Sequence, residues 1–159
     1  MTRARPEDVP LLVELMTEFY AEAGYELDKP HAAAAFAALL ADEQLGFVWL
    51  LGSREECAGH MVVTLRYGME YGGLMACLDD LYVRPAHRNR GLATSSIRVM
   101  RSFCQARGVR AITVEVGVNN GPALKAYRNA GFAEAGERQI LALPLAAPSH
   151  VVPARETPE

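Results

Sequence analysis

A stretch that reads as a strand, a basic turn and a helix constrains this chain more than any other feature. Residues 79–93 read DDLYVRPAHRNRGLA. The apolar segment Leu81–Val83 favours a β-strand, which Pro85 ends because proline has a fixed backbone and no amide donor. Beyond the basic loop, Gly91 leads into a long amphipathic helix. The first amides of a helix lack partners within it and its dipole adds positive charge there, so this turn predicts an anion site.

Composition limits what such a chain can be. Its 159 residues fit one domain, and a hydrophobic fraction of 50% is enough for a substantial core. The formal net charge of −3 gives no bias toward nucleic acid. No apolar run is long enough to span a membrane, and the N-terminus does not resemble a signal peptide. The cysteines at positions 57, 77 and 104 follow neither a metal nor a disulfide spacing, so we expect a cytoplasmic protein without a metal.

Periodicity and turn residues predict alternating helices and strands. A strand–helix–strand unit from Leu78 to Val116 predicts a parallel pair with a right-handed crossover. The glycine-rich Tyr67–Leu74 reads as a loop at a substrate mouth, and Phe132–Glu134 with Arg138–Leu145 as a closing hairpin. We expect one domain over residues 1–145 and a flexible proline-containing tail over 146–159. The expected helices are residues 6–23, His31–Ala41, Leu92–Arg107 and Ala123–Asn129, and the other strands are Thr2–Arg5, Gly46–Leu51, Cys57–Leu65 and Arg110–Val116.

Two spaced motifs carry a resemblance to a known family. The turn matches Gln/Arg-x-x-Gly-x-Gly/Ala through Arg88, Asn89, Arg90, Gly91, Leu92 and Ala93. Downstream, the pattern Asn-x-x-Ala-x-x-x-Tyr-x-x-x-Gly-Phe is matched by Asn120, Ala123, Tyr127, Gly131 and Phe132. Together they resemble the GNAT family of acetyl-CoA-dependent N-acetyltransferases, over about residues 45–145. The resemblance implies an α/β fold: a mixed, twisted sheet with helices on both faces, whose central parallel strands, Leu78–Val83 and Ala111–Val116, splay apart into a cleft.

The resemblance also implies how acetyl-CoA would bind. The backbone of Leu81, Tyr82 and Val83 would bond the pantetheine arm as if it were an added strand. Amides of Arg88–Ala93 would hold the pyrophosphate, and Asn120 would bond the cofactor arm. Tyr127 would lie near the thioester sulfur and protonate the leaving thiolate, since a phenol keeps its proton at neutral pH.

An amine acceptor must lose a proton before it can attack, and three acids are candidates for the base. Asp79 and Asp80 alternate along one strand, so at most one should reach a given side of the sheet. Glu115 lies on the neighbouring strand. In related ribosomal-protein N-terminal acetyltransferases a glutamate matching Glu115 serves as base, whereas in polyamine acetyltransferases an acidic pair matching Asp79 and Asp80 meets the substrate. The sequence leaves this choice open, and a water relay also fits.

The expected function is transfer of acetyl from acetyl-CoA to a primary amine by direct attack in a ternary complex. The expected acceptor is a small cationic or amino-acid-like molecule, bound by Asp79, Asp80 and Glu115. A protein N-terminus or a lysine is the alternative acceptor. The non-enzymatic alternative is an acetyl-CoA-binding sensor or an inactive partner subunit, which the intact Tyr127 and Glu115 disfavour. Dimers are frequent in the family, so a homodimer stays an open expectation. His60 is expected to be a core or edge residue.

Overall fold

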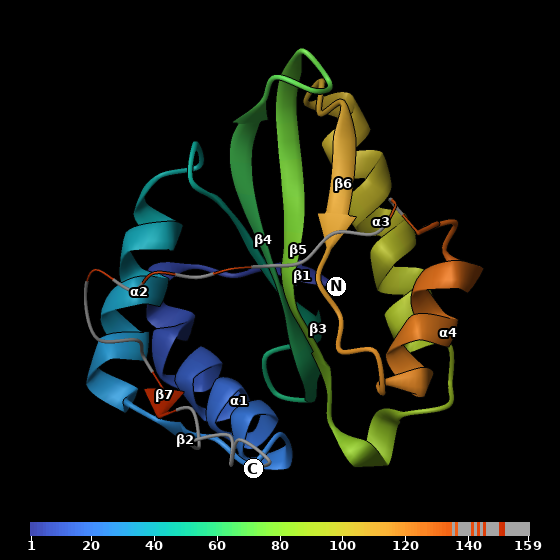
Figure 1. Cartoon of the computed structure of the whole chain (residues 1–159). Coiled ribbons are helices and arrows are strands. Elements are labelled where there is room, and N and C mark those ends of the chain that lie inside the picture. The colour runs from blue at the N-terminus through green and yellow to red at the C-terminus, as the bar shows by residue number, and fades with distance from the viewer. Residues whose placement is uncertain (135, 137–140, 142, 144, 146–149, 152–159) are drawn as a thin grey trace, which may run out of the picture.

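A five-stranded sheet separates two layers of helices in the computed structural model (Figure 1). The structure describes residues 1–134, 136, 141, 143, 145, 150 and 151. All neighbouring strands are antiparallel except the last pair, which is parallel. The expected mixed sheet is therefore confirmed. In spatial order the strands are β1 (Thr2–Arg3), β3 (Gly46–Gly52), β4 (Cys57–Gly68), β5 (Gly73–Val83) and β6 (Ala111–Val114).

Helices cover both faces of the sheet, as expected (Figure 1). On one face lie α1 (Val9–Glu22) and α2 (Lys29–Ala41), and on the other α3 (Leu92–Ala106) and α4 (Gly121–Asn129). Strand alternation creates the two cores that hold them. In β3, Val48 and Leu50 pack toward α1, whereas Phe47, Trp49 and Leu51 pack toward α3.

Local signals in the sequence fix the helix ends. The 3₁₀ turn η1 (Pro6–Asp8) leads into α1, and the side chain of Asp28 caps α2 by accepting from the His31 amide at 3.0 Å. A short second sheet pairs β2 (Glu26–Leu27) with β7 (His150–Val151). Most of the tail expected over residues 146–159 lies outside the described residues, so its flexibility stays a prediction.

The prediction of a loop over Tyr67–Leu74 is wrong in extent. Tyr67 pairs with Leu74 and Gly68 with Gly73, so only residues 69–72 connect β4 to β5. A Cβ at Gly68 would collide with the Met75 side chain in its present position. Most of the second strand of the expected closing hairpin, Arg138–Leu145, lies outside the described residues. Its first segment, Phe132–Glu134, is described and forms no strand.

The central parallel strands part where the sequence predicts a cleft. β5 pairs with β6 from Met75 to Leu78, and the last pair is Leu78 with Val114. β5 then continues to Val83 while still paired with β4 on its other edge. The edge of β5 beyond Leu78 that faces away from β4 therefore has no pairing with β6.

Candidate active site

A β-bulge in β5 places both aspartates on one face of the sheet. Val62 pairs with Asp80 and Val63 with Leu78, so Asp79 is an extra residue in the ladder. Such a residue interrupts the alternation of side chains along a strand. As a result Asp79 and Asp80 both line one pocket on the α1 and α2 side. The prediction that these two residues face opposite sides is wrong for this reason.

The pocket lies between the two N-terminal helices and the sheet, and its volume is about 490 Å³. That is within the usual size range for small-molecule sites. Tyr20 of α1 and Phe36 of α2 contribute aromatic walls, and Val62 and Thr64 contribute the β4 side. Among the described residues that line it, the ionisable ones are Asp79, Asp80 and Tyr20.

The carboxylates influence one another. Asp79 is exposed at the pocket mouth, yet the protein atoms around it displace enough water to raise its pKa. The negative charges of Asp80 and Glu115 raise that pKa further. Glu115 directly follows β6 and is exposed. The three predicted acids therefore share one electrostatic site, and Asp79 holds its proton more strongly than an ordinary aspartate.

Asp80 lies close to the buried His60, a contact that the sequence analysis did not predict. The Nε2 atom of His60 lies 3.8 Å from a carboxylate oxygen of Asp80, whose side chain is 15% exposed. His60 is fully buried, and the rings of Phe19, Phe36 and Tyr82 surround it at centroid distances of 6.1–6.3 Å. Neither of its nitrogens has a hydrogen-bond partner among the described residues. His60 is thus a core residue, as expected, but one that touches the site.

Two tyrosines approach the carboxylates from opposite layers. Tyr127 of α4 is half-buried and packs edge-on against Phe132, with centroids 5.7 Å apart. Burial and the charge of Asp80 raise the pKa of Tyr127, so its phenol keeps its proton. Burial, Asp80 and Asp79 likewise raise the pKa of Tyr20 to about 12. Sequence reasoning missed Tyr20, because its place in the apolar stripe of α1 reads as a core position.

The turn before α3 has the backbone of an anion site. Asn89 and Gly91 have positive φ angles of 59° and 72°. Gly91 is the N-cap of α3, and no side chain in the described part of the chain caps that end. The first bond within the helix runs from the Ser95 amide to the Gly91 carbonyl at 2.9 Å, which leaves the amides of Leu92 and Ala93 outside the helical ladder. Such nests of outward amides suit phosphate groups, so these residues fit the pyrophosphate of acetyl-CoA.

Arg88 is placed differently from the rest of this loop. Its Nε donates to the Val83 carbonyl oxygen at 2.8 Å, and its Nη2 pairs with Glu22 at 2.6 Å. Its guanidinium also lies over the Tyr82 ring, 5.8 Å from the centroid. The Arg88 side chain thus ties the loop to α1 while remaining 40% exposed, and Arg90 is exposed as well.

The remaining predicted cofactor residues lie around the splayed strands. Leu81 and Val83 turn their side chains into the α3 core, and Tyr82 is buried on the α1 side. Their backbone follows the part of β5 that has no pairing with β6. Asn120 is the N-cap of α4, and its Oδ1 accepts from the Ala123 amide at 3.2 Å. The Asn120 side-chain oxygen therefore already has a structural role.

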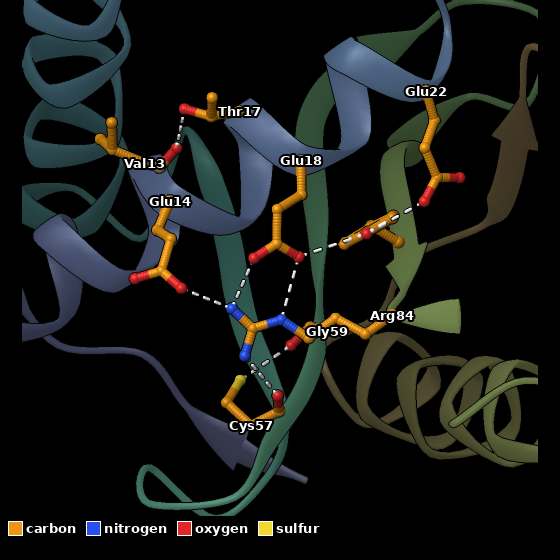
Figure 2. A network of polar contacts seen from close by, with 9 residues as sticks. Val13, Glu14, Thr17, Glu18, Glu22, Cys57, Gly59 and Arg84 are labelled. Atoms are coloured by element: carbon orange, nitrogen blue, oxygen red, sulfur yellow. Dashed lines mark hydrogen bonds and ion pairs between the residues drawn. The ribbon is translucent and has the colours of Figure 1, made fainter. Parts of the chain in front are cut away.

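A network of ion pairs and hydrogen bonds ties α1 to the end of β5 (Figure 2). Arg84, directly after β5, donates to Glu18 at 2.7 and 2.9 Å and to Glu14 at 2.6 Å. The hydroxyl of Tyr82 donates toward Glu18 and Glu22 at 3.2 Å each. Tyr20 lies on the same helix, so this network helps to position its ring across from the aspartates.

Other kinds of site find no support in the described part of the chain. Among those residues, no group of three or more histidine, cysteine, aspartate or glutamate side chains could hold a metal ion. None of the described helices combines the length and hydropathy needed to cross a membrane.

Comparisons with known proteins bear on the family and the fold. The model of the acetyltransferase (GNAT) family matches residues 10–132. The structure of an integron cassette protein from the mobile metagenome of Cole Harbour Salt Marsh is similar with a TM-score of 0.83 and 42% identity, covering 93% of this chain and 91% of that one. A predicted acetyltransferase from Clostridium acetobutylicum, solved with acetyl-CoA, has a TM-score of 0.75 at 18% identity, covering 88% and 93% of the two chains. At that identity the likeness concerns the fold.

One curated relative matches over a shorter stretch. The streptothricin acetyltransferase of Streptomyces lavendulae is 37% identical over 59 residues, which are 37% of this chain and 31% of that protein. The match therefore spans about a third of the length of this relative.

Proposed function

Because the chain belongs to the acetyltransferase (GNAT) family, we propose that it transfers the acetyl group of acetyl-CoA to the primary amine of a small cationic acceptor. The amine attacks the acetyl carbonyl directly while both substrates are bound. One observation carries the proposal: the bulge at Asp79 turns two carboxylates into a single pocket of small-molecule size, near Tyr127.

The chain offers suitable groups for acetyl-CoA. The amides around Gly91 would hold the pyrophosphate, and the edge of Leu81–Val83 away from β4 would bond the pantetheine arm as an added strand. Asn120 would contribute through its side-chain amide donor, since its oxygen caps α4. A protein of similar fold has been solved with acetyl-CoA, which supports this choice of co-substrate.

Asp79 is the proposed base. An ammonium group has no lone pair, so one proton must leave before attack. The raised pKa of Asp79 makes its carboxylate a stronger base than that of an ordinary aspartate, and it accepts the proton directly or through a water molecule. Asp80 and Glu115 add negative charge that attracts the cationic acceptor.

Tyr127 is the proposed acid. As the tetrahedral adduct collapses, the sulfur of coenzyme A departs as a thiolate. Tyr127 donates its phenolic proton to that sulfur, and its raised pKa keeps the proton available throughout the neutral range. The attacking nitrogen loses its second proton as the amide forms, and that proton returns through water to the Tyr127 phenolate, so that one proton in all, the one taken by Asp79, is released to solvent.

The alternatives are less well supported. A pocket of about 490 Å³ with walls from α1 and α2 suits a free amine better than a chain end or a lysine on a protein surface. A sensor or an inactive subunit would need no carboxylate pair beside a protonated tyrosine.

A screen of acceptors tests the proposal. Purified protein with acetyl-CoA is offered small cationic amines, amino acids, dicarboxylate amines, peptides with free N-termini and lysine peptides, and thiol release is followed. We expect turnover with small cationic amines and little with dicarboxylates. Preferential acetylation of peptides, or tight binding of acetyl-CoA without turnover on any amine, would overturn the proposal.

A further inference from the structure

We propose that the acceptor is a monoamine whose single ammonium group is attached to an apolar aliphatic or aromatic body, which fills the pocket between α1, α2 and the sheet. This inference rests on the proposed acetylation of an amine and narrows its substrate class.

Among the described residues that line the pocket, the charged ones all lie on one wall. Asp79 and Asp80 both belong to β5. The opposite wall is built by α2, and every α2 residue that lines the pocket is apolar: Ala32, Ala35, Phe36, Ala38 and Leu39. An ammonium group would therefore be held at β5, and whatever it carries would extend toward an apolar helix face.

The alanines of α2 leave the room that such a body needs. Ala32, Ala35 and Ala38 recur every three residues and line the pocket, whereas Ala34 and Ala37 on the same helix do not. Residues three or four positions apart share one face of a helix. The alanine run, which in the sequence indicates only helix propensity, thus sets the size of the pocket.

The same wall excludes a second charge. An acceptor with another ammonium group at its far end would bring that group against α2, whose own residues in the described lining carry no anionic or polar side chain. Burying an unpaired charge is costly. A methylene group in the same place would gain up to about fourfold in affinity from removal of apolar surface from water.

A ladder of matched amines tests this class. We would measure kcat/KM for ethylamine, butylamine and hexylamine, and for 1,6-diaminohexane, which differs from hexylamine by the second amine at its far end. We expect kcat/KM to rise with chain length, by up to about fourfold per methylene. It should fall by about tenfold or more from hexylamine to the diamine. A flat dependence on length, or preference for the diamine, would overturn the proposal.

Two substitutions in α2 test whether this helix forms the apolar wall of the acceptor pocket. Ala35 and Ala37 are both exposed, but only Ala35 lines the pocket, so Ala35→Leu narrows the pocket and Ala37→Leu adds the same side chain outside it. We expect Ala35→Leu to lower kcat/KM for hexylamine by about tenfold or more while ethylamine changes little. Ala37→Leu should leave both acceptors unchanged. Equal effects of the two substitutions would count against the pocket.

Direct binding separates this inference from the proposed function. Calorimetric titration of hexylamine into the protein with coenzyme A needs no turnover. Saturable binding that Ala35→Leu weakens and Ala37→Leu does not, without turnover of any amine, would support the apolar-body site and overturn the acetyl transfer. Turnover of short or polar amines without such binding would support the acetyl transfer and overturn the apolar-body site.

Discussion

The catalytic role proposed for Tyr127 can be tested separately from its packing. The ring makes the packing contact, and the hydroxyl holds the proton that is proposed to reach the sulfur of coenzyme A. Tyr127→Phe keeps the edge-on contact with Phe132 and removes only the proton donor. We expect kcat to fall by about ten- to a thousandfold, at or below the usual range for general acid catalysis because a thiolate leaves readily. The affinity for acetyl-CoA and the melting temperature should change little. A variant with wild-type kcat under chemistry-limited conditions would remove Tyr127 from the mechanism.

Asp79 offers a direct test of the electrostatics. Its pKa is raised by loss of water and by the negative charges of Asp80 and Glu115. Removing one of these charges must therefore lower it. We expect an NMR titration of the Asp79 carboxyl carbon to show a midpoint above about 3.9 in the wild type and a lower midpoint in Glu115→Gln. The same midpoint in both proteins would mean that Glu115 does not share the site.

At the scale of elements, the turn into α3 can be compared with the end of the same helix. Gly91 precedes α3 and Gly108 follows it, both have φ of 72°, and a Cβ at either would meet no atom of the described residues within 4 Å. Glutamate at either position carries the same backbone strain. We expect Gly91→Glu to weaken acetyl-CoA binding by about tenfold or more, since it places a negative charge at the anion site, whereas Gly108→Glu leaves affinity unchanged. Calorimetry with folded variants makes the comparison, and equal affinities would refute the phosphate assignment.

The link between α1 and β5 should make stability depend on pH. Hydrogen bonds from Arg84 lower the pKa of Glu18 in the folded state. The stabilisation by Glu18 is then complete above the pKa of the unfolded chain, about 4.3, and is lost as the pH falls through the lower folded value. We expect Glu18→Gln to cost about 1 kcal/mol at pH 7 and less at pH 3.5 in urea unfolding.

Glu14 provides the control for that measurement. It also pairs with Arg84, but its side chain is 61% exposed, against 34% for Glu18. Exposed pairs contribute little to stability, so Glu14→Gln should cost a few tenths of a kcal/mol at most. If the two substitutions lower the free energy of unfolding equally at every pH, the pair of Glu18 with Arg84 does not hold α1 in place.

At the scale of the whole molecule, the features that depend on neighbouring residues in the sequence were predicted correctly. The features that depend on contacts between distant segments were not. The strand, basic turn and helix over residues 79–93 were predicted because proline, glycine and helical periodicity act within a few residues. The bulge at Asp79 depends on register against β4, which no pattern along β5 records. The ion pair of Arg88 with Glu22 joins residues 66 positions apart, so the sequence offered only a basic side chain in an anion-binding turn.

The residues proposed for the two substrates lie on different helix layers of the fold. The α3 and α4 layer supplies the anion turn and Tyr127, and the α1 and α2 layer supplies the pocket. The bulge in β5 connects them, since Asp80 lines the pocket and raises the pKa of Tyr127 on the other layer. We therefore propose that one short stretch of β5 couples acceptor binding to proton transfer.

Amine-dependent release of coenzyme A, with the acetylated product identified by mass spectrometry, tests that claim most directly. The comparison is between the wild type, Asp79→Asn/Asp80→Asn and the control Glu56→Gln, which removes an exposed charge on the β3–β4 turn. We predict one N-acetylated amine per thiol released, and a loss of about 10²–10⁴-fold in kcat/KM for the double variant alone, with unchanged acetyl-CoA affinity. Wild-type rates in the double variant, or thiol release without an acetylated amine, would contradict it.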